Sequence, residues 1–166
     1  MPPITALLHT ENDALRLGRC LETLYPCDHI LIVDHGSRDR TVQLAREYGA
    51  RVITAAPGTS PDYYLRSAAP RWIAPGWILA LDPRESLTES LAASLFEWKS
   101  EWNSARSHAP AFSVFLREET AAGWLDIPAP QTRLVPHSWN LWNGSLPGSE
   151  PSAPALDGEL LRFVFP

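Results

Sequence analysis

Residues 29–41 read HILIVDHGSRDRT, an apolar β-branched run followed by a polar turn and the start of a helical pattern. The run His29–Val33 predicts a strand buried on both faces, because its apolar residues are continuous rather than alternating. The helical pattern continues to Tyr48 and stops at Gly49, a residue type that favours helix C-termini. Strand, polar turn and helix in this order are typical of one unit of a parallel sheet.

The same alternation continues on both sides of this stretch. Ile4–Leu8 predicts a first strand, and the helical spacing of residues 12–24 predicts a helix that Asn12 or Asp13 caps. Arg51–Thr54 and Trp77–Leu81 predict two further strands. Because the connections are short, the sequence predicts an α/β fold: a Rossmann-like three-layer sandwich on a mainly parallel sheet.

The rest of the chain is expected to be two helices and several strands, and the whole chain, residues 1–166, a single domain. Ser86 and Glu89 form a capping-box pattern before an amphipathic segment that ends near Trp102. Loops rich in Pro, Gly and Ser make residues 104–166 an irregular second part after an ordered first part, residues 1–103. The remaining expected elements are a short helix at Asp62–Ala69 and strands at Phe112–Leu116, Thr132–Val135 and Leu160–Phe165.

Composition excludes several classes of protein. The net charge of -5, from 14 Lys+Arg against 19 Asp+Glu, argues against nucleic acid as a partner. Lys99 is the only lysine, so an anion would be bound by arginine. Two cysteines, Cys20 and Cys27, exclude a disulfide framework; free thiols in the cytoplasm are expected, with one local disulfide as the alternative. No apolar run is long enough to span a membrane.

Polar residues follow three of the predicted strands, where ligands bind to open parallel sheets. Helix capping accounts equally well for Asn12 and Ser86. It does not account for Asp34 and Asp82, which end apolar strands and are expected to be exposed toward a cleft. The three clusters are His9–Asn12, Asp34–Asp39 and Asp82–Glu85.

These segments resemble the landmarks of family-2 glycosyltransferases. The likeness spans residues 4–100 and is carried by Thr10–Asp13, Ile32–Thr41 and Trp77–Asp82. The family implies a GT-A fold, a nucleotide-diphospho-sugar donor and inverting transfer to an acceptor hydroxyl. The chain looks similar to small bacterial enzymes of cell-surface glycan assembly, including lipopolysaccharide-core transferases, which implies a glycan or lipid-linked acceptor.

The resemblance implies roles for the first two clusters in binding the nucleotide. Thr10 and Glu11 would lie beside the base and ribose, and Asp34 would hydrogen-bond the base. Gly36 and Ser37 would belong to the loop that packs on the nucleotide.

The resemblance also implies roles near the transferred sugar. Asp82 matches the first acid of the family's metal-binding Asp-x-Asp pattern, which holds Mg²⁺ or Mn²⁺ on the donor diphosphate. Gln131 and Arg133 match a later Gln-x-Arg-Leu pattern and would face the donor or acceptor. The second acid of Asp-x-Asp is Arg84 here, and a guanidinium has no lone pair for a metal.

Two interpretations of Arg84 stay open. Its guanidinium could neutralise the diphosphate directly, so that transfer proceeds without metal. Alternatively it pairs with Asp82 or Glu85, and the site retains nucleotide affinity only. For the base that takes the acceptor proton, Glu85 is the first candidate, with Glu118 and Glu119 as alternatives on a loop after a strand.

Three functions therefore remain. The favoured one is sugar transfer to a cell-envelope glycan. A catalytically silent nucleotide-sugar-binding or scaffolding protein is the second, and an unrelated doubly wound binding domain is the third. The absence of glycine-rich phosphate loops argues against dinucleotide oxidoreductases and P-loop enzymes.

Overall fold

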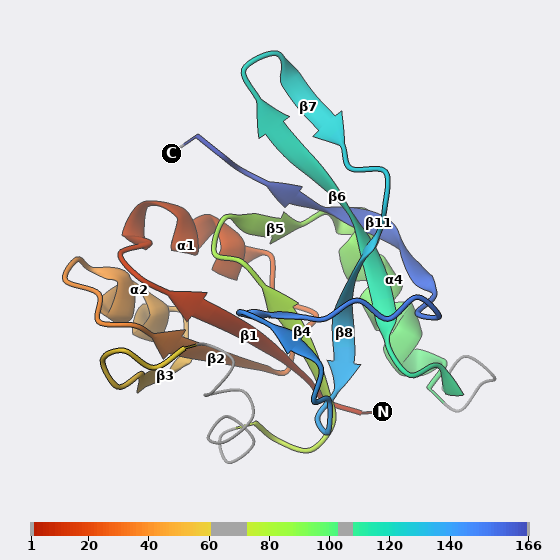
Figure 1. Ribbon diagram of the computed structural model, residues 1–166, viewed down its shortest axis with the longest axis horizontal. Coiled ribbons are helices and arrows are strands. Elements are labelled where there is room, and N and C mark those ends of the chain that lie inside the picture. Colours follow the sequence, from red (N-terminus) through yellow and green to blue (C-terminus); the bar gives the residue numbers. More distant parts are fainter. Residues whose placement is uncertain (1, 61–72, 103–107, 166) are drawn as a thin grey trace.

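Strands and helices alternate in the first half of the chain, and strands dominate the second half (Figure 1). The computed structural model describes residues 2–60, 73–102 and 108–165. The helices are α1 (Ala14–Glu22), α2 (Thr41–Glu47) and α4 (Glu89–Ser100). The strands are β1 (Ile4–Thr10), β2 (His29–Asp34), β3 (Arg51–Thr54), β4 (Trp77–Leu81), β5 (Glu85–Leu87), β6 (Phe112–Thr120), β7 (Gly123–Asp126), β8 (Gln131–Pro136), β9 (Trp142–Asn143), β10 (Leu146–Pro147) and β11 (Ala155–Arg162).

One large sheet joins both halves of the chain, in the order β3-β2-β1-β4-β8-β6-β11-β5, with β7 paired to β6. The pairs β3–β2, β2–β1 and β1–β4 are parallel, as the sequence predicts. Beyond β4 the sheet is mixed: β8 is antiparallel to both β4 and β6, whereas β11 is parallel to β6. The expectation of a mainly parallel sheet therefore fails for the second half, because no crossover helix separates β6, β7 and β8.

The chain reverses its direction of travel across the sheet between β1 and β4. From β1 it moves outward to β2 and β3, and then returns to place β4 on the other side of β1. Loops that leave the carboxyl ends of β1 and β4 diverge at such a reversal, and ligands of open α/β sheets bind there. We call the carboxyl ends of β1, β2 and β4 the switch-point edge.

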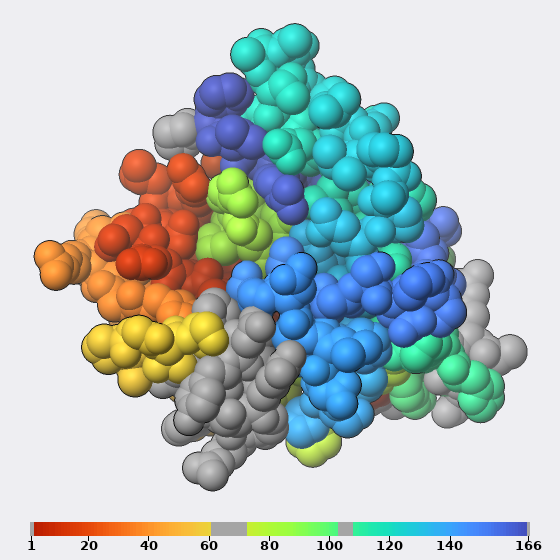
Figure 2. Space-filling view, viewed as in Figure 1, coloured from red at the N-terminus to blue at the C-terminus, as the bar shows by residue number. Residues whose placement is uncertain are grey.

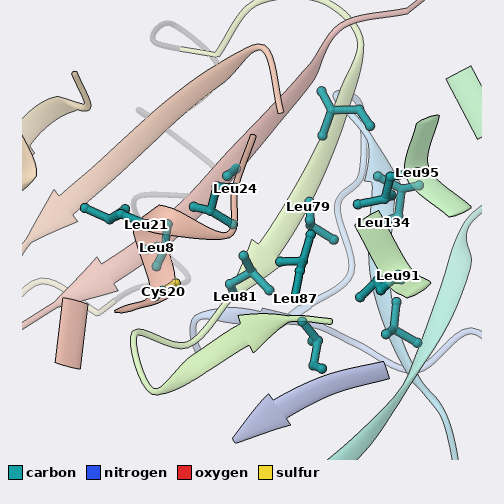
Figure 3. Close-up of a cluster of buried hydrophobic side chains, with 14 of the residues drawn as sticks. Leu8, Cys20, Leu21, Leu24, Leu79, Leu81, Leu87, Leu91, Leu95 and Leu134 are labelled. Carbon is teal, nitrogen blue, oxygen red and sulfur yellow. The ribbon is translucent and has the colours of Figure 1, made fainter. Parts of the chain in front are cut away.

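The described helices all pack on one face of the sheet. Leucines of α1 and α4 meet those of β1 and β4 in a single apolar cluster, which Figure 3 shows. The opposite face carries a second cluster, to which Trp142 of β9 contributes. Within residues 2–60, 73–102 and 108–165, the third layer is thus formed by β9, β10 and their loops rather than by helices. The helix expected at Asp62–Ala69 lies outside the described residues.

The helix α4 begins later than its sequence pattern predicts. Thr88 is the N-cap, and its Oγ1 accepts a hydrogen bond from the Leu91 amide at 3.2 Å. Ser86 instead lies in β5, where it pairs with Leu161 of β11. The capping-box prediction is therefore wrong, because pairing with a distant strand overrides the local helix signal.

Aromatic side chains anchor α4 to the sheet. Trp98 packs edge-on against Trp77 of β4 and against Trp102, with 5.1 Å between ring centroids in each pair. Trp98 is buried, so it is a core residue.

The C-terminal strands are longer than expected, and β6 with β7 forms a hairpin that projects from the body of the molecule (Figure 1). The strand expected at Leu160–Phe165 forms earlier, as β11 at Ala155–Arg162. In the described part of the chain, no helix is long and apolar enough to cross a membrane. Cys20 and Cys27 are free thiols.

Candidate functional site

The carboxyl ends of β1, β2 and β4 meet at one edge of the sheet. Thr10 lies beside Asp34 in the register of β1 and β2, and Leu8 lies beside Leu81 in that of β1 and β4. Burial raises the pKa of Asp13, and the negative charges of Asp82 and Asp39 raise it further. The Asp13 carboxylate, in the loop after β1, is therefore close enough to be repelled by carboxylates from the loops after β2 and β4.

Asp34 is buried at this edge rather than exposed toward a cleft. Only 2% of the residue is accessible, so the sequence-based expectation of exposure is wrong. Its Oδ1 accepts hydrogen bonds from the hydroxyls of Thr10 and Ser37, at 2.7 and 2.6 Å. Its Oδ2 accepts from the amides of Gly36 and Ser37, at 3.2 and 2.9 Å. Because a carboxylate has about four acceptor positions, Asp34 is saturated by its own chain and holds the loop after β2.

The loops after β1 and β2 are tied together. The Asn12 amide donates to Ser37 Oγ at 2.9 Å, and the Arg38 amide donates to Asn12 Oδ1 at 2.8 Å. Asn12 has a φ of 54° and does not cap α1, and Asp13 makes no side-chain cap bond either. The carboxylate of Asp39 accepts instead from the Ala14 amide at 3.2 Å. Glu11 is exposed in this tied pair of loops.

Asp82 and Arg84 form an ion pair after β4. Arg84 Nε lies 2.9 Å from Asp82 Oδ1 and Nη2 lies 3.2 Å from Oδ2, while the Arg84 amide also donates to Oδ1. Burial alone would raise the pKa of Asp82, but the bonds from Arg84 outweigh it and lower that pKa. The side chain of Arg84 is 37% exposed and that of Asp82 is 27% exposed. In Figure 2 the yellow-green segment after β4 reaches the surface between the red and dark blue parts of the chain.

The residues at this position do not fit a divalent cation. Both oxygens of Asp82 are engaged by the Arg84 guanidinium, which can offer no lone pair to a metal. Among the residues that the structure describes, no group of three His, Cys, Asp or Glu side chains is arranged to hold an ion. The donor set therefore disagrees with a metal on Asp82.

Glu85 and Arg133 form a buried ion pair behind the edge. Both side chains are 0% exposed, and Arg133 donates to the two Glu85 oxygens at 2.7 and 2.8 Å. Arg162 adds a bond of 3.0 Å to Glu85, and Arg133 also donates to Gln131 Oε1 at 2.9 Å. Burial opposes the ionisation of Glu85, but Arg133 and then Arg162 outweigh it and lower the pKa.

This pair corrects two expectations. Glu85 cannot act as the base, because its carboxylate is buried and neutralised on both oxygens. Arg133 does not face a ligand, because its guanidinium is enclosed with Glu85 and the Ala80 carbonyl oxygen. Gln131 is half-buried beside it.

The two remaining candidate bases lie in the β6–β7 hairpin rather than on a loop after the strand. Glu118 accepts a bond of 3.3 Å from Arg162, and its side chain is 34% exposed. The bond to Asp82 is the main cause of the raised pKa of Arg84, and burial opposes it. The negative charge of Glu118 makes a smaller contribution that also raises this pKa. Glu119 accepts from the Phe165 amide at 2.9 Å. Of the two carboxylates, Glu118 is therefore the one whose charge acts on Arg84.

Sequence reasoning missed the pairing of His9 with His35. Nδ1 of His9 lies 2.8 Å from Nε2 of His35, and the two rings are stacked with 5.1 Å between centroids. Burial, with a smaller contribution from His35, lowers the pKa of His9 to about 3. The sequence signal was the position of both residues at the ends of neighbouring parallel strands.

Two cavities of about 410 and 450 Å³ lie away from the switch-point edge. The first is lined by residues such as Thr5, Cys27 and Tyr48, at the opposite ends of the strands. The second lies between the β6–β7 hairpin and residues 156–159.

Known proteins share sequence with this chain over part of their length. No family model matches it. It is 33% identical over 125 residues to a TPR repeat-containing protein of Synechococcus elongatus. This match covers 74% of this chain and 29% of that protein. It is also 33% identical over 94 residues to an uncharacterized glycosyltransferase of Rickettsia felis. That match covers 55% of this chain and 32% of that protein.

A third relative is LpsC, a lipopolysaccharide core biosynthesis glycosyltransferase of Rhizobium meliloti. It is 41% identical over 46 residues, covering 28% of this chain and 17% of LpsC. The chain thus spans at most about a third of the length of these curated relatives.

A solved structure shares the fold. S. aureus TarS, residues 1–349, superposes with a TM-score of 0.54 at 16% identity, covering 76% of this chain and 38% of that one. The chain is therefore similar in sequence to curated glycosyltransferases, its strand-end motifs follow the order of the family-2 landmarks, and its architecture is that of the GT-A fold.

Proposed function

We propose that the chain binds a nucleoside-diphospho-sugar at the switch-point edge and transfers the sugar, with inversion, to a hydroxyl of a cell-envelope glycan. The observation that carries this proposal is the partly exposed side chain of Arg84 at that edge, where the motif of family-2 glycosyltransferases would hold the donor diphosphate. A guanidinium binds two phosphate oxygens in a planar, bidentate contact.

Inverting transfer needs stabilisation of the leaving group. The acceptor oxygen attacks the anomeric carbon from the face opposite the diphosphate, the bond from carbon to the diphosphate oxygen breaks, and negative charge grows on the leaving nucleotide. Arg84 would neutralise that charge by exchanging the carboxylate of Asp82 for the diphosphate. Groups placed for this purpose are worth several kcal/mol of barrier.

The acceptor hydroxyl must also lose its proton. Glu118 is the candidate that we favour, because its side chain is partly exposed and its negative charge raises the pKa of Arg84. Glu119 has its Oε1 on the Phe165 amide and serves as the matched control. We expect Glu118→Gln to lower kcat by roughly 100-fold or more and Glu119→Gln to leave it nearly unchanged.

A second function, nucleotide-sugar binding without turnover, is favoured by the Asp82–Arg84 bond itself. Arg84 holds both oxygens of Asp82, and a pair that stayed closed would leave the diphosphate without a counter-charge. The chain would then be a catalytically silent nucleotide-sugar-binding or scaffolding protein, which is the second function that the sequence leaves open.

Calorimetric titration with UDP and GDP, with and without Mn²⁺, tests donor binding, and donor hydrolysis by the purified protein tests turnover. Metal-independent binding with EDTA-insensitive hydrolysis supports the transferase. Binding without hydrolysis supports the silent protein. Binding that Mn²⁺ strengthens would contradict both, because both assign the counter-charge to Arg84. No affinity for either nucleotide would favour an unrelated binding domain.

The acceptor and the cellular setting rest on the relatives. LpsC is named for lipopolysaccharide core biosynthesis, which supports an envelope glycan or lipid-linked acceptor for this chain. We further propose a cytoplasmic location, and a division in which residues 1–103 bind the donor and residues 104–166 face the acceptor.

A further inference from the structure

His9 carries a buried nitrogen without a partner at the switch-point edge. The residue is 9% exposed, and its Nε2 is the one buried side-chain N or O atom without a hydrogen bond among residues 2–60, 73–102 and 108–165. A buried polar atom without a partner typically costs about 1–3 kcal/mol. An ordered water or a bound ligand is the usual partner of such an atom, and its place at the ligand-binding edge of the sheet favours a ligand.

The position of His9 identifies which ligand this is. In the parallel register His9 lies beside Val33 of β2, and the register of β1 with β4 pairs Leu8 with Leu81. Continued by one residue, that register places His9 beside Asp82. His9 is therefore on the central strand of the edge, next to the Asp82–Arg84 pair.

The chemistry of the imidazole ring indicates which kind of ligand group can bond to Nε2. Nδ1 of His9 is already engaged with His35 Nε2, so Nε2 is the nitrogen left for a ligand. In one tautomer Nε2 accepts a hydrogen bond, and in the other it donates one. A hydroxyl can satisfy either tautomer, because it both donates and accepts.

We propose that Nε2 of His9 hydrogen-bonds a hydroxyl of the nucleotide-sugar donor, either on the ribose or on the transferred sugar. This inference rests on the proposed function and adds a residue that positions the donor. His9 is a poor candidate for the base, since a ring that stays neutral in its buried setting holds a proton weakly.

The binding test compares His9→Phe with wild type and with a control, His29→Gln, by calorimetry. His29 is exposed at the amino end of β2, away from the edge. The probes are whichever of UDP and GDP binds more tightly, and its glucose conjugate. We expect His9→Phe to weaken binding by about 3- to 10-fold, the effect of one hydrogen bond, and His29→Gln to change nothing. Equal weakening of both probes assigns the ribose, and weakening of the conjugate alone assigns the sugar.

Two further readouts separate a ligand contact from a structural role. In wild type labelled with ¹⁵N-histidine, the probe should move the Nε2 resonance of His9. The rise in Tm that the probe gives wild type should also be smaller in His9→Phe at the same probe concentration, because the variant binds the probe more weakly.

The outcomes that overturn the inference are distinct from those that overturn the function. Unchanged affinity of His9→Phe for both probes, with an unmoved Nε2 resonance, would refute the contact while donor binding stands. An equal probe-induced rise in Tm for wild type and His9→Phe would refute it as well. If wild type binds neither UDP nor GDP, the proposed function fails and this contact fails with it.

Discussion

Replacing Glu85 with Gln should destabilise the fold strongly, because Glu85 neutralises a guanidinium that has no access to water. Glu85 and Arg133 are both 0% exposed, and Arg133 donates to both carboxylate oxygens. Breaking such a pair from one side leaves a buried charge uncompensated, at about 3–5 kcal/mol. For a domain of this size, that loss corresponds to roughly 6–20 °C in Tm.

The lowered pKa of Glu85 adds a pH dependence of known sign. Because the folded protein holds this carboxylate ionised more firmly than the unfolded chain does, the unfolded chain binds more protons at acidic pH. The stabilisation from Glu85 is therefore complete above its ordinary pKa, and it is lost as the pH falls through the lowered one. Glu85→Gln should flatten the acid side of the stability profile.

Urea unfolding followed by tryptophan fluorescence measures the effect. Glu97→Gln is the matched control, since Glu97 is exposed on α4, and it should change the free energy of unfolding by less than about 0.5 kcal/mol. The double variant Glu85→Leu, Arg133→Met should recover most of the loss, because it removes both charges. A loss below about 1 kcal/mol for Glu85→Gln would refute the assignment of a structural role. So would abolished turnover at unchanged stability.

Three further predictions concern the edge and the thiols. Arg84→Asp should create an Asp-x-Asp pair with Asp82. Mn²⁺ should then strengthen UDP binding by the variant in calorimetry, whereas it should not strengthen binding by wild type. If Mn²⁺ has no effect on the variant, the view that Arg84 takes the place of the ion is wrong. His9 stays neutral down to about pH 3 when folded, while the unfolded chain protonates it near pH 6.5, so stability should fall from pH 7 to pH 4. The fall in the free energy of unfolding with falling pH should be shallower in His9→Phe, by up to about 1.4 kcal/mol per pH unit. Identical profiles of Tm against pH for the variant and wild type would contradict this prediction. Burial raises the pKa of Cys27 to about 12, and it also raises the pKa of Cys20 well above its ordinary value. Native protein at pH 8 should therefore react slowly with iodoacetamide and unfolded protein quickly, and equal rates would show that this prediction is wrong.

The strand ends were accessible to sequence reasoning, whereas the state of each side chain was not. Apolar runs at Ile4–Leu8, His29–Val33 and Trp77–Leu81 predict parallel strands, and the structure pairs them side by side. The saturation of Asp34 depends on Thr10, which is 24 positions away in the sequence. The burial of Glu85 depends on Arg133, 48 positions away. Neither partner can be inferred from local patterns.

The linear pattern of this chain is enough to specify strand–helix alternation, the edge at which polar residues gather and the loss of the second metal-binding acid to Arg84. Such features depend on neighbouring residues, through backbone preference and the spacing of apolar side chains. Which carboxylates are buried, which arginine neutralises each, and that Nε2 of His9 is left without a partner depend on contacts between strands that lie far apart in the sequence. Those contacts exist only after the sheet has closed around them, because desolvation and ion pairing act through space and not along the chain.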